Sequence, residues 1–211
     1  MVCRHVSLFD ASLPAVLYQR LGFHTRGVVM AELLSDPGFD LLYQRAGSVF
    51  VARDHDPAAA SLAARVAARL GPRTVGVVFP EGRLARPELI GPALERLGAR
   101  DPDRAARLAS LRHLLPPRPG GVSALLDAAP DADVVVVHHV GFDHHRRFVD
   151  LVDAAPLDRP IRVDVRRIAR SEVPDGPERT RWFDDLWLEL DRWVAVQLDG
   201  GSGRESNGVA S

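Results

Sequence analysis

Residues 74–82 read TVGVVFPEG, an almost unbroken apolar run followed by a turn. A short apolar run of this kind is typical of a β-strand that is buried on both faces of a parallel sheet. The Pro-Glu-Gly that follows predicts a turn at the carboxyl end of that strand. In open α/β sheets, ligands gather beyond the carboxyl ends of strands, so Glu81 and Gly82 are placed where a site is expected.

Strand and helix patterns alternate on either side of this run. The strongest strand signal is the VVVV of residues 134–137, inside the segment 132–140. Further strands are expected at 26–31, 47–53 and 161–165, the last with one wet face. Helices are expected at 11–21, 37–45, 56–71, 87–112 with a break near 101–102, 122–128 and 178–198. This alternation predicts one α/β domain, residues 1–198, in which helices flank a mixed, largely parallel sheet, and a disordered tail at 199–211.

The composition limits the kinds of ligand and partner that the chain is expected to bind. The chain has 211 residues and a formal net charge of -1, which gives no reason to expect a nucleic acid partner. No Lys occurs, so an anionic ligand must be held by Arg side chains or by backbone amides. The single cysteine, Cys3, allows no internal disulfide and is typical of a reducing compartment. No apolar run approaches the roughly 20 residues that span a bilayer.

Four short blocks carry the chemistry, and they occur in a fixed order. They read HVSLFD at 5–10, GSVFVAR at 47–53, FPEG at 79–82 and LPPR at 115–118. Each block alone is common by chance. Together they resemble the glycerophospholipid acyltransferase family, of the lysophosphatidic acid acyltransferase type. The stretch VDVRR at 163–167, followed by Trp182 and Trp187, looks like the lysocardiolipin acyltransferase branch.

The resemblance implies a glycerol-3-phosphate acyltransferase-like fold and an O-acyltransferase of phospholipid biosynthesis or remodelling. A fatty acyl group would pass from acyl-CoA, or from acyl carrier protein, to the free hydroxyl of a lysophospholipid such as 1-acylglycerol-3-phosphate. No metal and no cofactor beyond this co-substrate are expected. The acceptor and the donor would be met at a membrane surface, with the protein peripheral on its cytoplasmic face.

In this resemblance His5 is the general base and Asp10 is its partner. An imidazole suits the removal of a hydroxyl proton because its pKa lies near operating pH. Asp10 would accept the second ring N–H of His5 and stabilise the imidazolium. No enzyme nucleophile is needed, because the substrate hydroxyl fills that role. The alternative is a helix-capping Asp10 and an unrelated His5.

The resemblance assigns the remaining site residues to substrate binding. Arg53 would hold the acceptor phosphate, or else form a surface ion pair. Glu81 and Gly82 would contribute acceptor binding and the shape of the site, or else form an ordinary turn. Arg83 stands where the family usually has Thr before its Arg, and Arg118 would line the donor or the acceptor path.

Arg4 is a second departure from the family, which usually has Asn before the His. An Arg at this position would lower the pKa of His5 or offer another phosphate fork. Asp143 also follows a predicted strand end, as His5 would if residues 1–4 form a strand.

Two side-chain groups and one rival function stay open at this stage. The pairs His138-His139 and His144-His145 could bind a metal or lie at the edge of the core, although adjacent strand residues point to opposite faces. Trp182, Trp187 and Trp193 form either a membrane-facing stripe or packed core. The family usually carries an upstream membrane-associated segment and a full strand before the His motif. The rival to an enzyme is therefore a truncated, catalytically degenerate acyltransferase-like binding module.

Overall fold

The computed structural model describes residues 1–11, 13–30, 49–51, 66–143, 145, 150, 153–154, 157 and 160–202. Arg53, His144, the expected helix at 37–45 and most of the one at 56–71 lie outside these residues. In the described part of the chain, no helix is both long enough and apolar enough to cross a membrane.

The strands form a mixed sheet that is parallel except at one edge. They are β1 (Val2–Cys3), β2 (His24–Met30), β3 (Val49–Val51), β4 (Thr74–Val77), β5 (Val134–Val140) and β6 (Arg162–Ile168). Two ladders, β3-β2-β4 and β1-β5-β6, meet at a parallel bridge between Val2 and Val78. The spatial order is therefore β3-β2-β4-β1-β5-β6. Only β6 runs antiparallel to its neighbour, β5. The mixed, largely parallel sheet expected from the sequence is confirmed.

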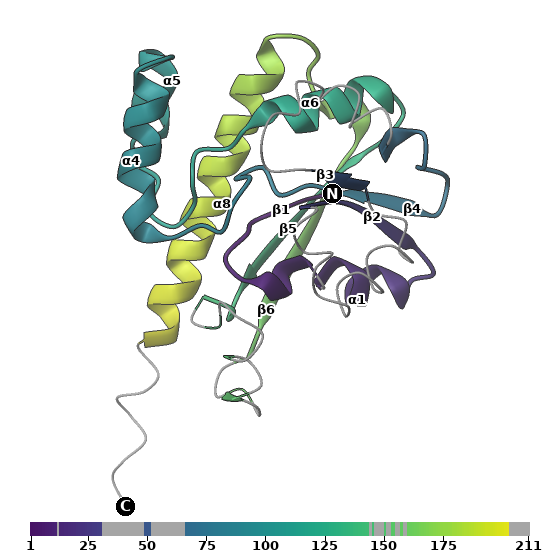
Figure 1. Ribbon diagram of the computed structural model, residues 1–211, viewed down its shortest axis with the longest axis horizontal. Coiled ribbons are helices and arrows are strands. Elements are labelled where there is room, and N and C mark those ends of the chain that lie inside the picture. The colour runs from purple at the N-terminus through teal and green to yellow at the C-terminus, as the bar shows by residue number, and fades with distance from the viewer. Residues whose placement is uncertain are drawn as a thin grey trace, which may run out of the picture.

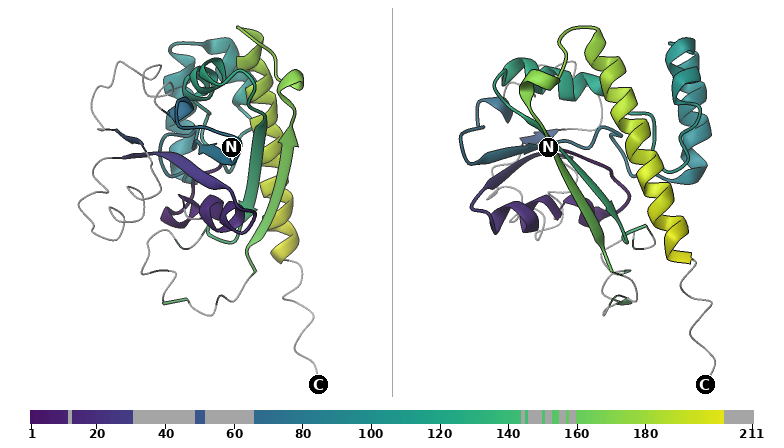
Figure 2. Two further views of the ribbon diagram at one scale, coloured as in Figure 1. Left: turned by 90° about the vertical axis from the view of Figure 1, so that its right-hand side faces the viewer. Right: turned by 180° about the vertical axis from the view of Figure 1, so that it is seen from behind.

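Helices lie on both faces of this sheet (Figures 1 and 2). They are η1 (Leu8–Ala11), α1 (Leu13–Gln19), α4 (Pro87–Gly98), α5 (Pro102–Leu108), α6 (Pro119–Ala128), η3 (Arg170–Glu172) and α8 (Glu178–Ser202). Alternate residues of β5 separate the two layers, as the period of a strand requires. Val134 and Val136 join the core under α6 and α8, whereas Val135 and Val137 pack with side chains of α1.

Several local expectations hold at the level of single residues. The break near 101–102 separates α4 from α5, and Asp101 caps α5 by accepting the backbone N–H of Arg104 at 3.0 Å. Pro102 takes the first helical position, where its missing N–H costs nothing. Trp187 is fully buried and donates its indole N–H to the Leu115 carbonyl at 2.9 Å, so the tryptophan stripe belongs to the core.

Two expectations need correction. β6 is exposed from residue 162 to residue 167 and only its last residue, Ile168, is buried; Val163 and Val165 are 36% and 50% exposed. The reason is its position at the sheet edge, where its polar residues turn toward α8 and Arg166 pairs with Glu189 at 3.0 Å. α8 runs through Ser202, so residues 199–202, expected in the tail, continue the helix.

One carboxylate on α8 fixes the loop that leads to the site. Asp191 accepts three consecutive backbone N–H groups, from Arg112, His113 and Leu114, at 2.8–3.0 Å. The buried carboxylate thus satisfies donors that the end of the α4–α5 hairpin leaves open. Leu115, the next residue, is thereby held in place for the contact with Glu81 described below.

Candidate active site

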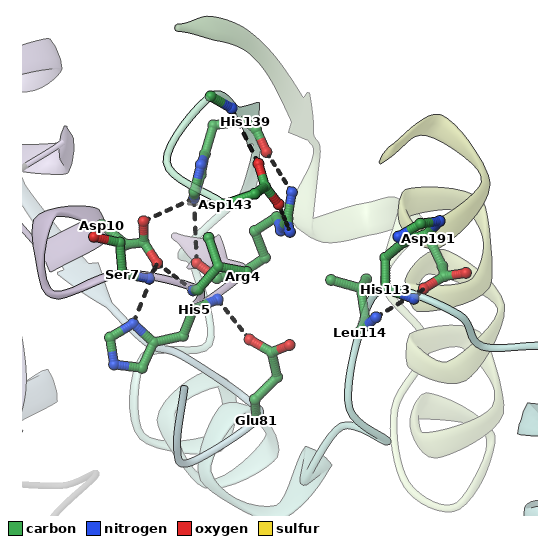
Figure 3. A network of polar contacts seen from close by, with 12 residues as sticks. Arg4, His5, Ser7, Asp10, Glu81, His113, Leu114, His139, Asp143 and Asp191 are labelled. Atoms are coloured by element: carbon green, nitrogen blue, oxygen red, sulfur yellow. Dashed lines mark hydrogen bonds and ion pairs between the residues drawn. The ribbon is translucent and has the colours of Figure 1, made fainter. Parts of the chain in front are cut away.

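Two of the four sequence blocks, HVSLFD and FPEG, lie at the carboxyl ends of neighbouring strands, and Asp143 follows the next strand. β1 lies between β4 and β5, and all three run in the same direction. His5 follows β1, Glu81 follows β4 and Asp143 follows β5. Figure 3 shows these side chains gathered around the start of the chain. A parallel sheet brings these turns together at one edge, as expected for a ligand site.

The segment before His5 is anchored in the middle of the sheet. Met1, Val2 and Cys3 are buried, and Cys3 donates its backbone N–H to the Val78 carbonyl at 3.2 Å. Burial, and then the nearby carboxylates of Asp10 and Glu81, raise the pKa of the Cys3 thiol well above its ordinary value. Cys3 is therefore a protonated core side chain and not a nucleophile.

His5 and Asp10 face each other across a tight turn. His5 Nδ1 lies 3.4 Å from Asp10 Oδ2, at the long end of a hydrogen bond. The same oxygen accepts the backbone N–H of Val6, and that of Ser7 at 2.8 Å. Asp10 therefore holds the backbone of this turn and also faces His5, whereas the alternative drawn from the sequence had His5 unrelated to Asp10. The catalytic roles of both residues stay predictions.

The imidazole of His5 stays accessible from one side. Its side chain is 20% exposed, and its ring packs on Phe79 with the ring centroids 4.5 Å apart. Because Nδ1 is turned toward buried Asp10, Nε2 is the nitrogen available to a bound molecule. An imidazole that is fixed at Nδ1 and whose Nε2 has no hydrogen bond to the described residues has the arrangement that general base chemistry needs.

Glu81 holds the main chain at His5. Its buried carboxyl group accepts the His5 backbone N–H at 2.5 Å through Oε2 and the Leu115 N–H at 3.3 Å through Oε1. Burial raises the pKa of Glu81 to about 8, and the Arg4 charge and these two N–H groups offset only part of that effect. The His5 carbonyl in turn accepts the Ala85 N–H at 2.5 Å. The segment after β4 therefore holds the main chain of His5 through both its N–H and its carbonyl.

Two more residues expected to bind substrate, Gly82 and Arg118, lie against each other. Gly82 has a φ of 67°, and a Cβ placed there would lie 3.1 Å from Arg118 Nη1, so the Arg118 side chain lies against this glycine. The Arg118 N–H also donates to the Pro80 carbonyl at 2.8 Å. Arg83 and Arg118 are exposed, as an anion-binding role requires. Arg53 lies outside the described residues, and these binding roles stay predictions.

Arg4 and Asp143 form a buried pair that the motif spacing does not reveal. Arg4 donates to Asp143 Oδ1 at 2.6 Å and to the His139 carbonyl at 2.8 Å, so its guanidinium is directed to the end of β5. Burial opposes ionisation of Asp143, but the Arg4 charge and the Gly141 N–H together lower its pKa. The sequence singled out Arg4 as a departure from the family and placed Asp143 after a predicted strand, but nothing in it indicated that the two residues pair.

The histidine pair of β5 is divided between the two faces of the sheet. The His138 ring lies 5.3 Å from that of Trp193 on the α8 side, whereas His139 lies on the α1 side beside Arg4 and Asp10. The opposite orientation expected for adjacent strand residues is thus confirmed. Among the described residues, no group of three or more His, Cys, Asp or Glu side chains is arranged to hold a metal ion.

Comparisons with known proteins agree with this arrangement. The family model described as Acyltransferase matches residues 1–140, which is more than half of the chain and includes all four blocks. The match does not distinguish the lysocardiolipin acyltransferase branch. No curated protein and no solved structure matched the chain. By the family match, the chain belongs to the acyltransferase family, as its resemblance to the glycerophospholipid acyltransferases indicates.

Proposed function

We propose that this acyltransferase moves a fatty acyl group from an acyl thioester to the free hydroxyl of a lysophospholipid such as 1-acylglycerol-3-phosphate. The thioester is acyl-CoA or acyl carrier protein, and the reaction serves phospholipid biosynthesis or remodelling. The observation that carries the proposal is the His5–Asp10 pair, 3.4 Å apart at the carboxyl edge of the sheet in a chain of this family.

In the proposed reaction, Nε2 of His5 removes the proton of the acceptor hydroxyl. The hydroxyl oxygen then attacks the thioester carbonyl carbon, and the carbon–sulfur bond breaks. The proton held on Nε2 passes to the departing thiolate, which leaves the imidazole neutral again. Asp10 accepts the Nδ1–H throughout, which fixes the tautomer and stabilises the imidazolium formed in the middle of the reaction.

Arginines supply the charge for an acceptor that carries a phosphate. Arg83 and Arg118 are exposed at the turn that grips His5, and the Arg118 guanidinium lies against Gly82. A guanidinium presents a planar fork that matches phosphate oxygens, and this chain has no Lys to share the task. We propose that these two residues, with Arg53, bind the headgroup while the protein lies peripherally on the cytoplasmic face of the membrane.

The experiment measures thiol release from a long-chain acyl-CoA in the presence of lysophosphatidic acid in mixed micelles, with mass spectrometry of the lipid product. His5→Ala is expected to lower the rate by roughly 10²- to 10⁴-fold, the usual contribution of a general base. His24→Ala is the matched control, because His24 is exposed and begins β2, so it lies at the amino end of a strand and not at the carboxyl ends where His5 lies. A parallel assay with acyl carrier protein distinguishes the two donors.

Three outcomes distinguish the proposed enzyme from a catalytically degenerate binding module. Product formation that depends on His5 but not on His24 supports the proposal. Product formation at the wild-type rate in His5→Ala removes His5 from the role of base. Saturable binding of lysophosphatidic acid without product from either donor favours the degenerate binding module.

A further inference from the structure

His139 is a fully buried polar side chain to which the proposed reaction assigns no role. It lies on β5 among valines, and its neighbours on the same face, Val135 and Val137, are packed against α1. Its ring Nδ1 has no hydrogen-bond partner among the described residues. A buried polar nitrogen without a partner costs about 1–3 kcal/mol, so an apolar residue would suit this place better on packing grounds alone.

The other ring nitrogen of His139 is directed at Asp10. His139 Nε2 lies 3.5 Å from Asp10 Oδ1 and 3.3 Å from the Arg4 carbonyl. Figure 3 shows the Asp10 carboxylate between the rings of His5 and His139. The division between the two oxygens is complete. Oδ2 contacts His5 and the backbone of the turn, whereas Oδ1 has no hydrogen bond to the described residues and faces His139.

The protonation of His139 follows from its surroundings. Nε2 faces two oxygens that can only accept, provided Asp10 is a carboxylate, so Nε2 carries the hydrogen. Burial is the main cause that lowers the pKa of His139, and the charge of Arg4 adds to it, whereas Asp10 and Asp143 act in the opposite direction. His139 is therefore a neutral imidazole at neutral pH that directs its single N–H between Arg4 O and Asp10 Oδ1.

We propose that His139 is a positioning residue that acts through Asp10: its Nε2–H limits rotation of the Asp10 carboxylate, so that Oδ2 stays turned toward Nδ1 of His5. The inference rests on the proposed function, in which His5 is the base. Without this contact the carboxylate would be held by the turn through one oxygen only, so it could tilt about its last bond and move Oδ2 out of line with Nδ1 of His5. The base would then lose its fixed orientation, and a small misplacement of a catalytic group can cost roughly 10²-fold in rate.

Two amide variants test the position of the donor with little change in polarity. In His139→Gln the side-chain nitrogen reaches the place of Nε2, whereas in His139→Asn it lies near the place of Nδ1. We expect His139→Gln to keep kcat within a few-fold of wild type. His139→Asn and His139→Leu are expected to lower kcat by roughly 10- to 100-fold with KM nearly unchanged. His138→Gln, on the other face of the same strand, is the control.

A double-mutant cycle then shows whether His139 acts through Asp10. In an Asp10→Asn background, His139→Leu should lower kcat no further, because the carboxylate that it orients is gone. A merely structural role predicts that the two losses multiply, and that Gln, Asn and Leu affect kcat only in proportion to the loss of thermal stability. The inference is overturned if the two losses multiply, or if kcat in the three variants follows only their thermal stability. If His139→Leu does not fold, the comparison of His139→Gln with His139→Asn tests the inference alone.

A readout without substrate separates this inference from the proposed function. In ¹⁵N NMR spectra, His5 should show the Nδ1–H tautomer in wild type and in His139→Gln, and a mixture of tautomers in His139→Asn; His5→Gln identifies the signals. If the His5 tautomers follow this pattern but no acceptor receives an acyl group, the proposed function is contradicted and the positioning role is retained. If acyl transfer depends on His5 but the His5 signals are unchanged in every His139 variant, only the positioning role is contradicted.

Discussion

The carboxyl group of Glu81 accepts the backbone N–H of His5 at 2.5 Å, so the turn after β4 holds the main chain of the proposed base. The second oxygen of Glu81 accepts the Leu115 N–H, which ties the loop after α5 to the same point. Because both oxygens of Glu81 accept backbone N–H groups, this side chain fixes the positions of the His5 and Leu115 segments around the site. This geometry is compatible with the expected role in site shape, while direct acceptor binding by Glu81 stays a prediction.

Glu81 should make the folded protein less stable as the pH rises. Burial is the largest cause that raises its pKa, from an ordinary 4.5 to about 8. Between these two values the folded state keeps the proton and the unfolded state loses it, so the free energy of unfolding falls by up to about 1.4 kcal/mol per pH unit. The stabilisation is complete below about pH 4.5 and is lost as the pH passes the folded value.

The measurement is urea denaturation of wild type and Glu81→Gln at intervals from pH 5 to pH 8. Gln resembles the protonated carboxyl and cannot titrate, so the difference between the two proteins isolates Glu81 from His138 and His139, whose pKa values are lowered by burial. We expect the wild type to lose stability relative to Glu81→Gln as the pH rises. Parallel curves would show that Glu81 does not titrate in this window.

Asp10 should have separable effects on catalysis and on folding. Asp10→Asn keeps an oxygen that can accept the backbone N–H groups of Val6 and Ser7, but it removes the charge behind the His5 imidazole. We expect a rate lower by roughly 10²- to 10⁴-fold with only a small change in stability. Asp10→Ala leaves both buried N–H groups without an acceptor and should also cost about 1–3 kcal/mol in the free energy of unfolding.

Thiol release and urea denaturation give the two quantities on the same samples. Asp131→Ala, at an exposed position between α6 and β5, is the control for loss of one negative charge. Equal stability of the Asn and Ala variants would contradict the capping role of Asp10. An unchanged rate in Asp10→Asn would contradict its role beside His5.

The sequence predicted those parts of the fold that depend on local pattern. Apolar runs marked β4 and β5, and the turn residues after them marked the edge where His5 and Glu81 meet. The break between α4 and α5 followed from Asp101 and Pro102, whose effects on a helix start act over a few residues. These features could be predicted because the residues that cause them are neighbours in the chain.

The contacts behind the site depend on which strands lie side by side, and no local pattern contains that information. Arg4 and Asp143 are 139 positions apart and meet only because β1 pairs with β5. The same pairing brings His139 to Asp10, although the sequence offered His139 as a metal ligand or a core-edge residue. β6 shows the opposite failure. Its alternating pattern is that of a half-buried strand, but its place at the sheet edge leaves every residue except Ile168 exposed.

The Arg4–Asp143 pair should be costly to break from one side only. The Arg4 side chain is fully enclosed and Asp143 is largely buried. Arg4→Leu or Asp143→Leu leaves one charge buried without its partner, and each should cost about 3–5 kcal/mol in the free energy of unfolding. The double variant removes both charges and should cost clearly less than the sum of the two single changes.

Urea denaturation of the four proteins in this cycle gives the coupling energy. The exposed pair Arg166–Glu189 is the matched control, for which about 0–1 kcal/mol is expected. If the two cycles gave equal coupling energies, the buried pair would not hold the start of the chain to the end of β5 as described here.

Gly82 should resist substitution for two distinct reasons, which can be measured separately. Its φ of 67° lies in the left-handed region, where an L side chain costs about 1–2 kcal/mol. An added Cβ would also lie 3.1 Å from Arg118 Nη1, so the flexible Arg118 side chain would have to move. Gly82→Ala should therefore lower stability by about 1–2 kcal/mol and, because Arg118 is displaced, raise KM for a phosphate-bearing acceptor.

Gly120→Ala and Arg118→Ala separate these two causes. Gly120 lies in the first turn of α6 with no atom near an added Cβ, so its variant should be as stable as wild type or more stable, by a few tenths of a kcal/mol to about 1 kcal/mol. In an Arg118→Ala background, Gly82→Ala should still lower stability, because the backbone conformation is unchanged. It should no longer raise KM, because the guanidinium that it displaces is absent. If KM rises equally in both backgrounds, Gly82 shapes the acceptor site by itself and the contact with Arg118 has no part in acceptor binding.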